Sequence, residues 1–98
     1  GMRIQVKKAA KQEYAKAQTY LGVMYEKGLC VEQDLQKAYE WYTIAAEQED
    51  PAALFNLGNM YEFGKGVERN CQEAARWYER AAAQGNDYAL KKLSNVEP

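Results

Sequence analysis

The stretch LGVMYEKGLCVEQDLQKAYEWYTIAAEQ, Leu21–Gln48, decides the fold because it returns 36 residues later as LGNMYEFGKGVERNCQEAARWYERAAAQ, Leu57–Gln84. When residues 15–50 are laid over residues 51–86 without gaps, sixteen of the 36 positions are identical. A fixed period of 20 to 50 residues is typical of proteins that stack one structural unit along the chain. The 98 residues are therefore predicted to form one repeat domain.

The same register continues beyond both copies. Ala9, Ala10 and Gln12 lie 36 residues before Ala45, Ala46 and Gln48, and Ala89 and Leu93 lie 36 residues after Ala53 and Leu57. The predicted organisation of residues 1–98 is a partial repeat with its second helix at 3–14, complete repeats at 15–50 and 51–86, and a C-terminal capping helix at 87–98 that is the first half of another repeat.

Apolar residues in each repeat follow a helical period. Those in the first half fall at i, i+3, i+4, i+7 and i+8, and so do those in the second half, which predicts two amphipathic helices per repeat. They are Ala17, Tyr20, Leu21, Met24 and Tyr25, followed by Ala38, Trp41, Tyr42, Ala45 and Ala46. We expect an all-α fold, an α-α superhelix of tandem antiparallel helix pairs, with helices near 3–13, 16–27, 34–48, 51–63, 70–84 and 87–95.

Glycine and capping residues punctuate the pattern. Asp34 and Asn70 are predicted N-caps of the second helices, and Asp50 precedes Pro51 as a cap of the predicted helix at 51–63. Gly28 and Gly64 suit the left-handed position that ends a helix. Gly22 and Gly58 lie in mid-helix, where glycine costs about 1 kcal/mol relative to alanine, so we expect a close helix crossing there.

The repeated residues resemble a known family, the Sel-one-like repeat, a relative of the tetratricopeptide repeat with a longer interhelical loop. The resemblance rests on Leu-Gly, Tyr, Gly, Val, Lys-Ala or Ala, Trp-Tyr, Ala-Ala and Gln at the same places in both copies. It implies a right-handed α-solenoid and a non-catalytic adaptor that holds protein or peptide partners, often in a bacterium. Cys30 and Glu49 replace glycines of the family, so the loop path of the first repeat is open, and Asn70 replaces the usual Asp in the second repeat.

The tetratricopeptide relationship also implies a partner-binding groove along one face of each first helix. Phe55, Asn59 and Phe63 form one stripe of that face, off the core stripe, and either anchor a partner peptide or pack against the third unit or a second chain. Glu26 and Glu62 match between the copies and either orient a basic partner group or are solvated. The implied groove residues are Lys16, Thr19, Val23, Glu26 and Lys27 in the first repeat and Ala52, Phe55, Asn59, Glu62 and Phe63 in the second.

The matched Leu, Gly, Met, Tyr, Ala and Trp residues are interpreted as core. Cys71 takes the position of Leu35 and is predicted to be buried as a small apolar residue. Cys30 lies in a loop, and nothing in the pattern brings it near Cys71 for a disulfide. Two unpaired cysteines fit a reducing compartment, which favours a cytoplasmic location, although a removed signal peptide would leave no trace.

Composition excludes several classes of site. The chain has no histidine, and Ser94 is its only serine, so a Ser-His-Asp or Cys-His arrangement cannot form within it, and two cysteines cannot close a zinc site. The net charge is −1, without a basic stripe for nucleic acid, and no apolar run approaches the ~20 residues of a membrane span. We expect no catalytic residue, cofactor or metal. The alternatives to an adaptor are a segment that self-associates through its terminal helices and, more remotely, a hydrolase.

Overall fold

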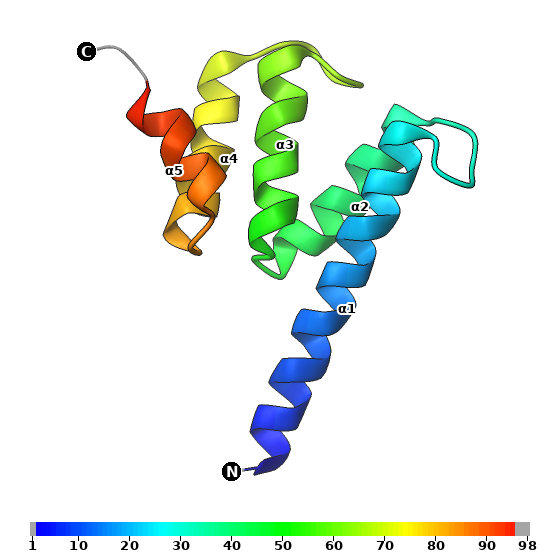
Figure 1. Cartoon of the computed structure of the whole chain (residues 1–98), viewed down its shortest axis with the longest axis vertical. Coiled ribbons are helices and arrows are strands. Elements are labelled where there is room, and N and C mark those ends of the chain that lie inside the picture. The colour runs from blue at the N-terminus through cyan, green and yellow to red at the C-terminus, as the bar shows by residue number, and fades with distance from the viewer. Residues whose placement is uncertain (1, 96–98) are drawn as a thin grey trace.

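A computed structural model describes residues 2–95, with side chains described from residue 11 onward. Five helices make up this part of the chain, which contains no strand (Figure 1). They are α1 (Met2–Lys27), α2 (Leu35–Glu47), α3 (Pro51–Phe63), α4 (Cys71–Ala83) and α5 (Asp87–Ser94). The predicted all-α class is confirmed.

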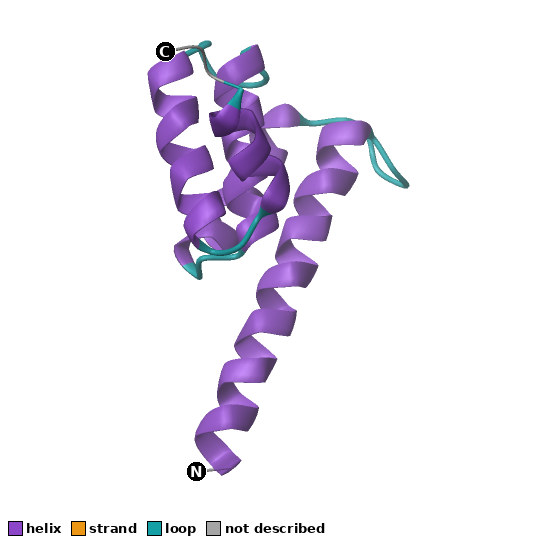
Figure 2. Ribbon diagram, turned by 60° about the vertical axis from the view of Figure 1, so that its left-hand side comes forward, coloured by secondary structure: helices purple, strands orange, loops and turns teal. Residues whose placement is uncertain are grey.

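The helices form successive antiparallel pairs. The pairs α1–α2 and α3–α4 stack through contacts between α2 and α3, and α5 packs on α4 as the first helix of a third unit (Figures 1 and 2). This arrangement is an α-solenoid of helix pairs, as predicted. The helix expected at 87–98 is present as α5, and residues 96–98 of that prediction lie outside the described residues. None of the described helices is both long and apolar enough to cross a membrane.

Short polar side chains cap the helices at the predicted places. The side chains of Asp34, Asp50 and Asn70 accept hydrogen bonds from the amides three residues later, at 3.1, 3.1 and 3.0 Å. Asn86 does the same for α5 at 2.8 Å. Each cap satisfies an amide that the first turn of a helix leaves without a partner.

The predicted break between helices 3–13 and 16–27 is wrong. Residues 2–27 form one continuous helix, α1, whose N-terminal half projects away from the other helices (Figures 1 and 2). The reason lies at the repeat boundary. The later boundary carries the cap Asp50 and Pro51, whereas the first carries Tyr14 and Ala15, which neither cap a new helix nor interrupt the old one.

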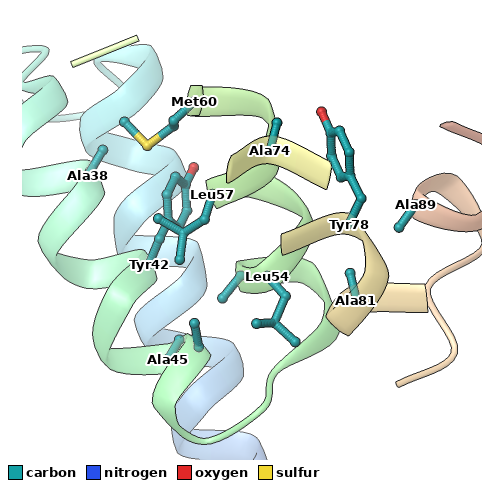
Figure 3. Close-up of a cluster of buried hydrophobic side chains, with 12 residues drawn as sticks. Ala38, Tyr42, Ala45, Leu54, Leu57, Met60, Ala74, Tyr78, Ala81 and Ala89 are labelled. Carbon is teal, nitrogen blue, oxygen red and sulfur yellow. The ribbon is translucent and has the colours of Figure 1, made fainter. Parts of the chain in front are cut away.

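Small and large side chains alternate through the core (Figure 3). Tyr42, Leu54, Leu57 and Met60 are its largest fully buried side chains, and alanines fill the closer crossings between them. The buried alanines of the cluster are Ala38, Ala45, Ala46, Ala53, Ala74, Ala81 and Ala89.

Gly22 and Gly58 mark the predicted close crossings. The Tyr42 ring lies directly against Gly22, and the Tyr78 ring lies against Gly58 in the same way, so that a Cβ on either glycine would overlap the ring. The prediction of a packing reason for both mid-helix glycines is confirmed. Glycine lowers the helix propensity at these two positions. Because it has no side chain, however, an aromatic ring from the second helix can pack directly against the first helix.

Matched core positions are not equally buried in the two repeats. Ala53, Leu57 and Met60 on α3 are fully buried beneath α2. Their counterparts on α1 are not: Ala17 is exposed, and Leu21 and Met24 are only partly buried. The prediction that these three α1 positions are core is therefore wrong, because within the described structure no helix covers α1 as α2 covers α3.

The two interhelical loops follow the same backbone path. In each, an amide bonds back to the first helix, from Asp34 to the Tyr25 carbonyl at 2.9 Å and from Asn70 to the Tyr61 carbonyl at 2.8 Å. Cys30 has a φ of 63°, close to the 72° of Gly66 in the second loop. The substitution at Cys30 therefore leaves the turn in the left-handed conformation and does not reroute it.

The structure corrects the prediction for Cys71, which is exposed. Its counterpart Leu35 is shielded because the loop of the next repeat lies against it, with Gly66 so close that an added Cβ would be 2.9 Å from Leu35 Cβ. The third unit has no such loop among the described residues, so Cys71 is left open. Cys30 is also a free, exposed thiol.

Candidate protein-binding surface

A hollow of about 450 Å³ joins the first helices of three successive units. We call it the first-helix hollow. Lys16 and Thr19 come from α1, Pro51 and Ala52 from α3, and the remaining lining residues from the turn into α5 and its first residues, apart from the cap Asp50. Its lining residues are Lys16, Thr19, Asp50, Pro51, Ala52, Gly85, Asn86, Asp87 and Tyr88.

Hydrogen bonds connect two of the residues that line this hollow, Thr19 and Asp50. The Thr19 hydroxyl donates to Asp50 Oδ2 at 2.7 Å, and the same oxygen accepts the Ala53 amide at 3.1 Å. Both side chains are buried, with 6% of Thr19 and 7% of Asp50 exposed. The cap of α3 is thereby tied to α1, which fixes the spacing of the two helices across the hollow.

Aromatic side chains of α3 and α5 pack together next to the hollow. The Phe55 ring packs against Tyr78 at 5.5 Å and against Tyr88 at 5.9 Å between centroids. Phe55 and Tyr88 also line a smaller hollow of about 270 Å³ with Lys91, Lys92 and Asn95. Packing against the third unit was one of the two predicted roles of Phe55, and the structure shows this contact. Tyr88 itself is 73% exposed and open to a partner.

Phe63 lies at the opposite end of α3, away from the first-helix hollow. Its side chain is 57% exposed, and the Lys92 ammonium lies 5.0 Å from the ring centroid. Such a cation–π contact orients both side chains without burying either. Lys27, the last residue of α1, is also exposed.

The two matched glutamates have partners within the chain. Glu26 accepts the Tyr42 hydroxyl at 2.6 Å and lies 3.4 Å from Lys65 Nζ. Glu62 accepts the Tyr78 hydroxyl at 2.6 Å and lies 3.0 Å from Lys92 Nζ. Both carboxylates therefore serve the helix packing, which differs from the two predicted roles of a partner-facing or a solvated group.

These bonds shift the protonation equilibria of the groups. Partial burial alone would raise the pKa of Glu62, but the Tyr78 hydroxyl and Lys92 outweigh it and lower the pKa below its ordinary value of 4.5. Burial, followed by the bonded carboxylate, raises the pKa of Tyr42 and of Tyr78 well above 10. Each tyrosine thus remains a hydrogen-bond donor, and Tyr78 donates to an ionised Glu62.

The structure divides the predicted groove residues into groups. Lys16, Thr19 and Ala52 meet in the first-helix hollow, and Phe55 lines the adjoining one. Val23 packs against the core, and Asn59 Oδ1 lies 2.7 Å from the Tyr78 hydroxyl oxygen. Glu26 and Glu62 are bonded as described, and Lys27 and Phe63 lie at the far end of their helices.

Sequence reasoning missed the contribution of the third unit to this surface. Tyr88 and Lys91 lie 36 residues after Ala52 and Phe55. The 36-residue register that relates the groove residues of the first two repeats therefore also points to them. Asp50 was expected only as a cap, and its place in the hollow follows from the way Thr19 reaches it.

A second and larger hollow, of about 620 Å³, lies over the outer face of α2. Ile44 is 40% exposed here, whereas its counterpart Arg80 covers Trp77 at 4.9 Å and pairs with Glu49. The first repeat therefore exposes an apolar side chain at the position where the second repeat has a charged one. Its lining residues are Tyr25, Lys37, Tyr39, Glu40, Trp41, Thr43 and Ile44.

Charge distinguishes the two hollows. Lys16 is exposed on the first-helix hollow, 3.5 Å from Glu13, and its neighbour Asp50 caps α3. Lys91 and Lys92 line the adjoining smaller hollow, where Lys91 is exposed and Lys92 pairs with Glu62. Asp87 lies in the first turn of α5, where the helix N-terminus offsets its charge. Within the described residues, no three acidic or cysteine side chains gather as metal ligands.

Comparisons with known proteins agree on one family. The profile of the Sel1 repeat matches residues 15–50 and 51–86. A comparison with curated proteins gave no match.

Solved structures with the same architecture are similar over most of this chain. A Sel1 repeat protein from Oxalobacter formigenes is 44% identical with a TM-score of 0.79, covering 83% of this chain and 33% of its own. The protective antigen c5321 of uropathogenic Escherichia coli, described as displaying an SLR fold, is 38% identical with a TM-score of 0.78, covering 81% of this chain and 17% of its own. Helicobacter pylori cysteine rich protein B is 32% identical with a TM-score of 0.74, covering 79% and 58%. This chain therefore spans from about a sixth to somewhat over half the length of these proteins.

Proposed function

Because this chain belongs to the Sel1 repeat family, whose members are generally protein-interaction modules, we propose that it is a non-catalytic module that binds a polypeptide segment in the first-helix hollow. The observation that carries this proposal is the contrast between the two repeats. Their packing residues are shared, whereas the first-helix residues that line a hollow of about 450 Å³, Lys16, Thr19 and Ala52, do not match between the repeats.

The chemistry of the hollow favours an acidic partner segment. Lys16 lines this hollow and Lys91 lines the adjoining smaller one, while the lining carboxylate of Asp50 already accepts hydrogen bonds within the chain and that of Asp87 lies in the first turn of α5. Tyr88 and the edge of Phe55 offer aromatic surface for one apolar side chain of the partner. The segment we propose thus carries two or more carboxylates around an aromatic or aliphatic anchor.

A peptide-binding experiment tests this function. Fluorescence anisotropy with a pool of labelled acidic peptides containing a central Phe, Leu or Trp should select binders, and a pool with Lys in place of Asp and Glu should not. Lys16→Glu and Lys91→Glu should each weaken binding by about tenfold, since each reverses a charge beside the ligand. Arg76→Glu is the matched control, because Arg76 is exposed on α4, outside both hollows.

The salt dependence of the same titration supplies a second criterion. Binding steered by exposed lysines weakens as ionic strength rises. Equal selection of acidic and basic pools, or equal losses in Arg76→Glu and Lys16→Glu, would contradict the proposed partner chemistry.

A further inference from the structure

One apolar face of the solenoid is uncovered. Ala17 on α1 is exposed and Leu21 and Met24 are partly buried, although their counterparts on α3 are fully buried under α2. We call these three residues the α1 face. The internal repeat indicates what kind of element covers such a face, namely a second helix like α2.

A segment of that kind exists in the sequence. The buried residues of α2 are Ala38, Tyr42, Ala45 and Ala46. The residues 36 positions earlier are all apolar: Met2, Val6, Ala9 and Ala10. The first thirteen residues therefore have the pattern of a helix that packs on the next first helix.

This segment cannot reach the α1 face of its own chain in the observed conformation. It is continuous with the rest of α1 and projects away from the body (Figures 1 and 2). To fold back it would need a turn near Tyr14, where the equivalent turn of the next repeat has Asp50 and Pro51. We call residues 2–13 the arm.

We propose that two copies of this chain pair through antiparallel α1 helices, so that the arm of each copy covers the α1 face of the other. The two copies exchange identical elements, which is the low-cost route to a symmetric dimer known as domain swapping. In the exchanged dimer, α1 is straight. In a monomer that covered its own α1 face, a turn near Tyr14 would divide it into two helices.

The contact register within the chain fits this pairing. Tyr39 of α2 meets Tyr61 of α3, with 2.8 Å between the hydroxyl oxygens. A shift of both positions by the 36-residue repeat places Arg3 opposite Tyr25, so the register but not the tyrosine pair is kept, and the midpoint of the two positions is Tyr14. A two-fold axis through Tyr14 therefore places both arms in register at once.

The seam along α1 has the spacing of a helix pair. Its positions alternate steps of four and three residues, the pattern by which two helices keep one face together. The pattern passes through Arg3 and Lys7 in the arm, and its uncharged part consists of Ala10, Tyr14, Ala17, Leu21 and Met24. Tyr14, at the proposed axis, is 63% exposed in the single chain.

The mass in solution tests the pairing. Sedimentation equilibrium should give twice the 11.2 kDa of one chain at micromolar concentration. Ala17→Glu should raise the dimer dissociation constant at least about tenfold, because it places a charge in the seam while its site is exposed in the monomer. Ala83→Glu, at an exposed alanine of α4, is the control and should leave the mass unchanged. A monomeric wild type would overturn the proposal.

Two further variants separate arm exchange from other dimers. Tyr14→Asp with Ala15→Pro copies the later repeat boundary and should give a helical monomer whose Leu21 and Met24 methyl groups are protected by its own arm. Tyr14→Cys, with Cys30→Ser and Cys71→Ser, should form an interchain disulfide on oxidation, and Ala83→Cys in the same background should not. A dimer that persists in the first variant, or that fails to crosslink through position 14, would contradict the exchange even if the wild type is dimeric.

Discussion

The Tyr78 hydroxyl donates a 2.6 Å hydrogen bond to Glu62, joining the second helix of the repeat to the first. Tyr42 and Glu26 make the same bond at 2.6 Å in the other repeat. The ring of each tyrosine packs against a glycine, so Gly22, Tyr42 and Glu26 form one packing unit and Gly58, Tyr78 and Glu62 form its repeat. This unit holds each helix pair together and bonds both glutamates within the chain.

Removal of the Tyr78 hydroxyl should destabilise the fold. We expect Tyr78→Phe to lower the free energy of unfolding by about 1–3 kcal/mol, because the bond to an ionised carboxylate is lost while the ring remains. Urea denaturation followed by circular dichroism measures this change. Tyr20→Phe is the control, since Tyr20 is 59% exposed, and its change should stay within about 0.5 kcal/mol.

Acid should weaken the contribution of the Glu62–Tyr78 hydrogen bond to stability. The pKa of Glu62 is lower in the folded chain than its ordinary value of 4.5, so its contribution is fully present above that value and is lost as the pH falls through the folded pKa. The urea midpoint should therefore fall as the pH drops below 4.5. Glu62→Gln should start from a lower midpoint and show a shallower decline, and parallel curves for the two proteins would refute this assignment.

The close approach at Gly58 should make alanine harmful despite its better helix propensity. Propensity alone would stabilise Gly58→Ala by about 1 kcal/mol, whereas overlap with the Tyr78 ring should produce a net loss of about 2 kcal/mol. Combining the change with Tyr78→Leu relieves the overlap. The double variant should then lose less than the sum of the two single losses, and additive losses would show that the ring does not limit the site.

Cys30 should be a position where glycine stabilises the chain. Its φ of 63° lies in the left-handed region, so Cys30→Gly should gain about 0.5–1 kcal/mol in thermal or urea unfolding. Cys30→Ser keeps the β-carbon and should gain nothing, which separates backbone strain from thiol chemistry. Gly66→Ala in the other loop should lose stability, because its Cβ would press on Leu35.

The features that recur could be predicted from the sequence, because a residue that is identical in both repeats indicates that the same packing contact is needed in both. The helix pairs, the caps at Asp34 and Asn70, and the crossings at Gly22 and Gly58 all follow from the duplication. Even the altered loop at Cys30 keeps the path of its counterpart.

Features that depend on a neighbouring unit were harder to predict. Leu21, Met24 and Cys71 occupy positions that are buried only when another unit lies beside them, so the pattern of one repeat overstated their burial. The predicted groove treated each first helix separately. It therefore omitted Tyr88 and Lys91 of the third unit and could not show that Asn59 and Glu62 bond to Tyr78.

Mapping the bound peptide by amide chemical shifts tests the central claim most directly. Titration of the ¹⁵N-labelled chain with an acidic peptide selected as above should shift the amides of Lys16, Ala52, Tyr88 and Lys91, which surround the first-helix hollow and its neighbour. The amides of Trp41 and Ile44, over the hollow on α2, should stay in place. Shifts confined to Trp41 and Ile44, or no saturable shifts with any acidic peptide, would contradict the claim that the first helices form the binding surface.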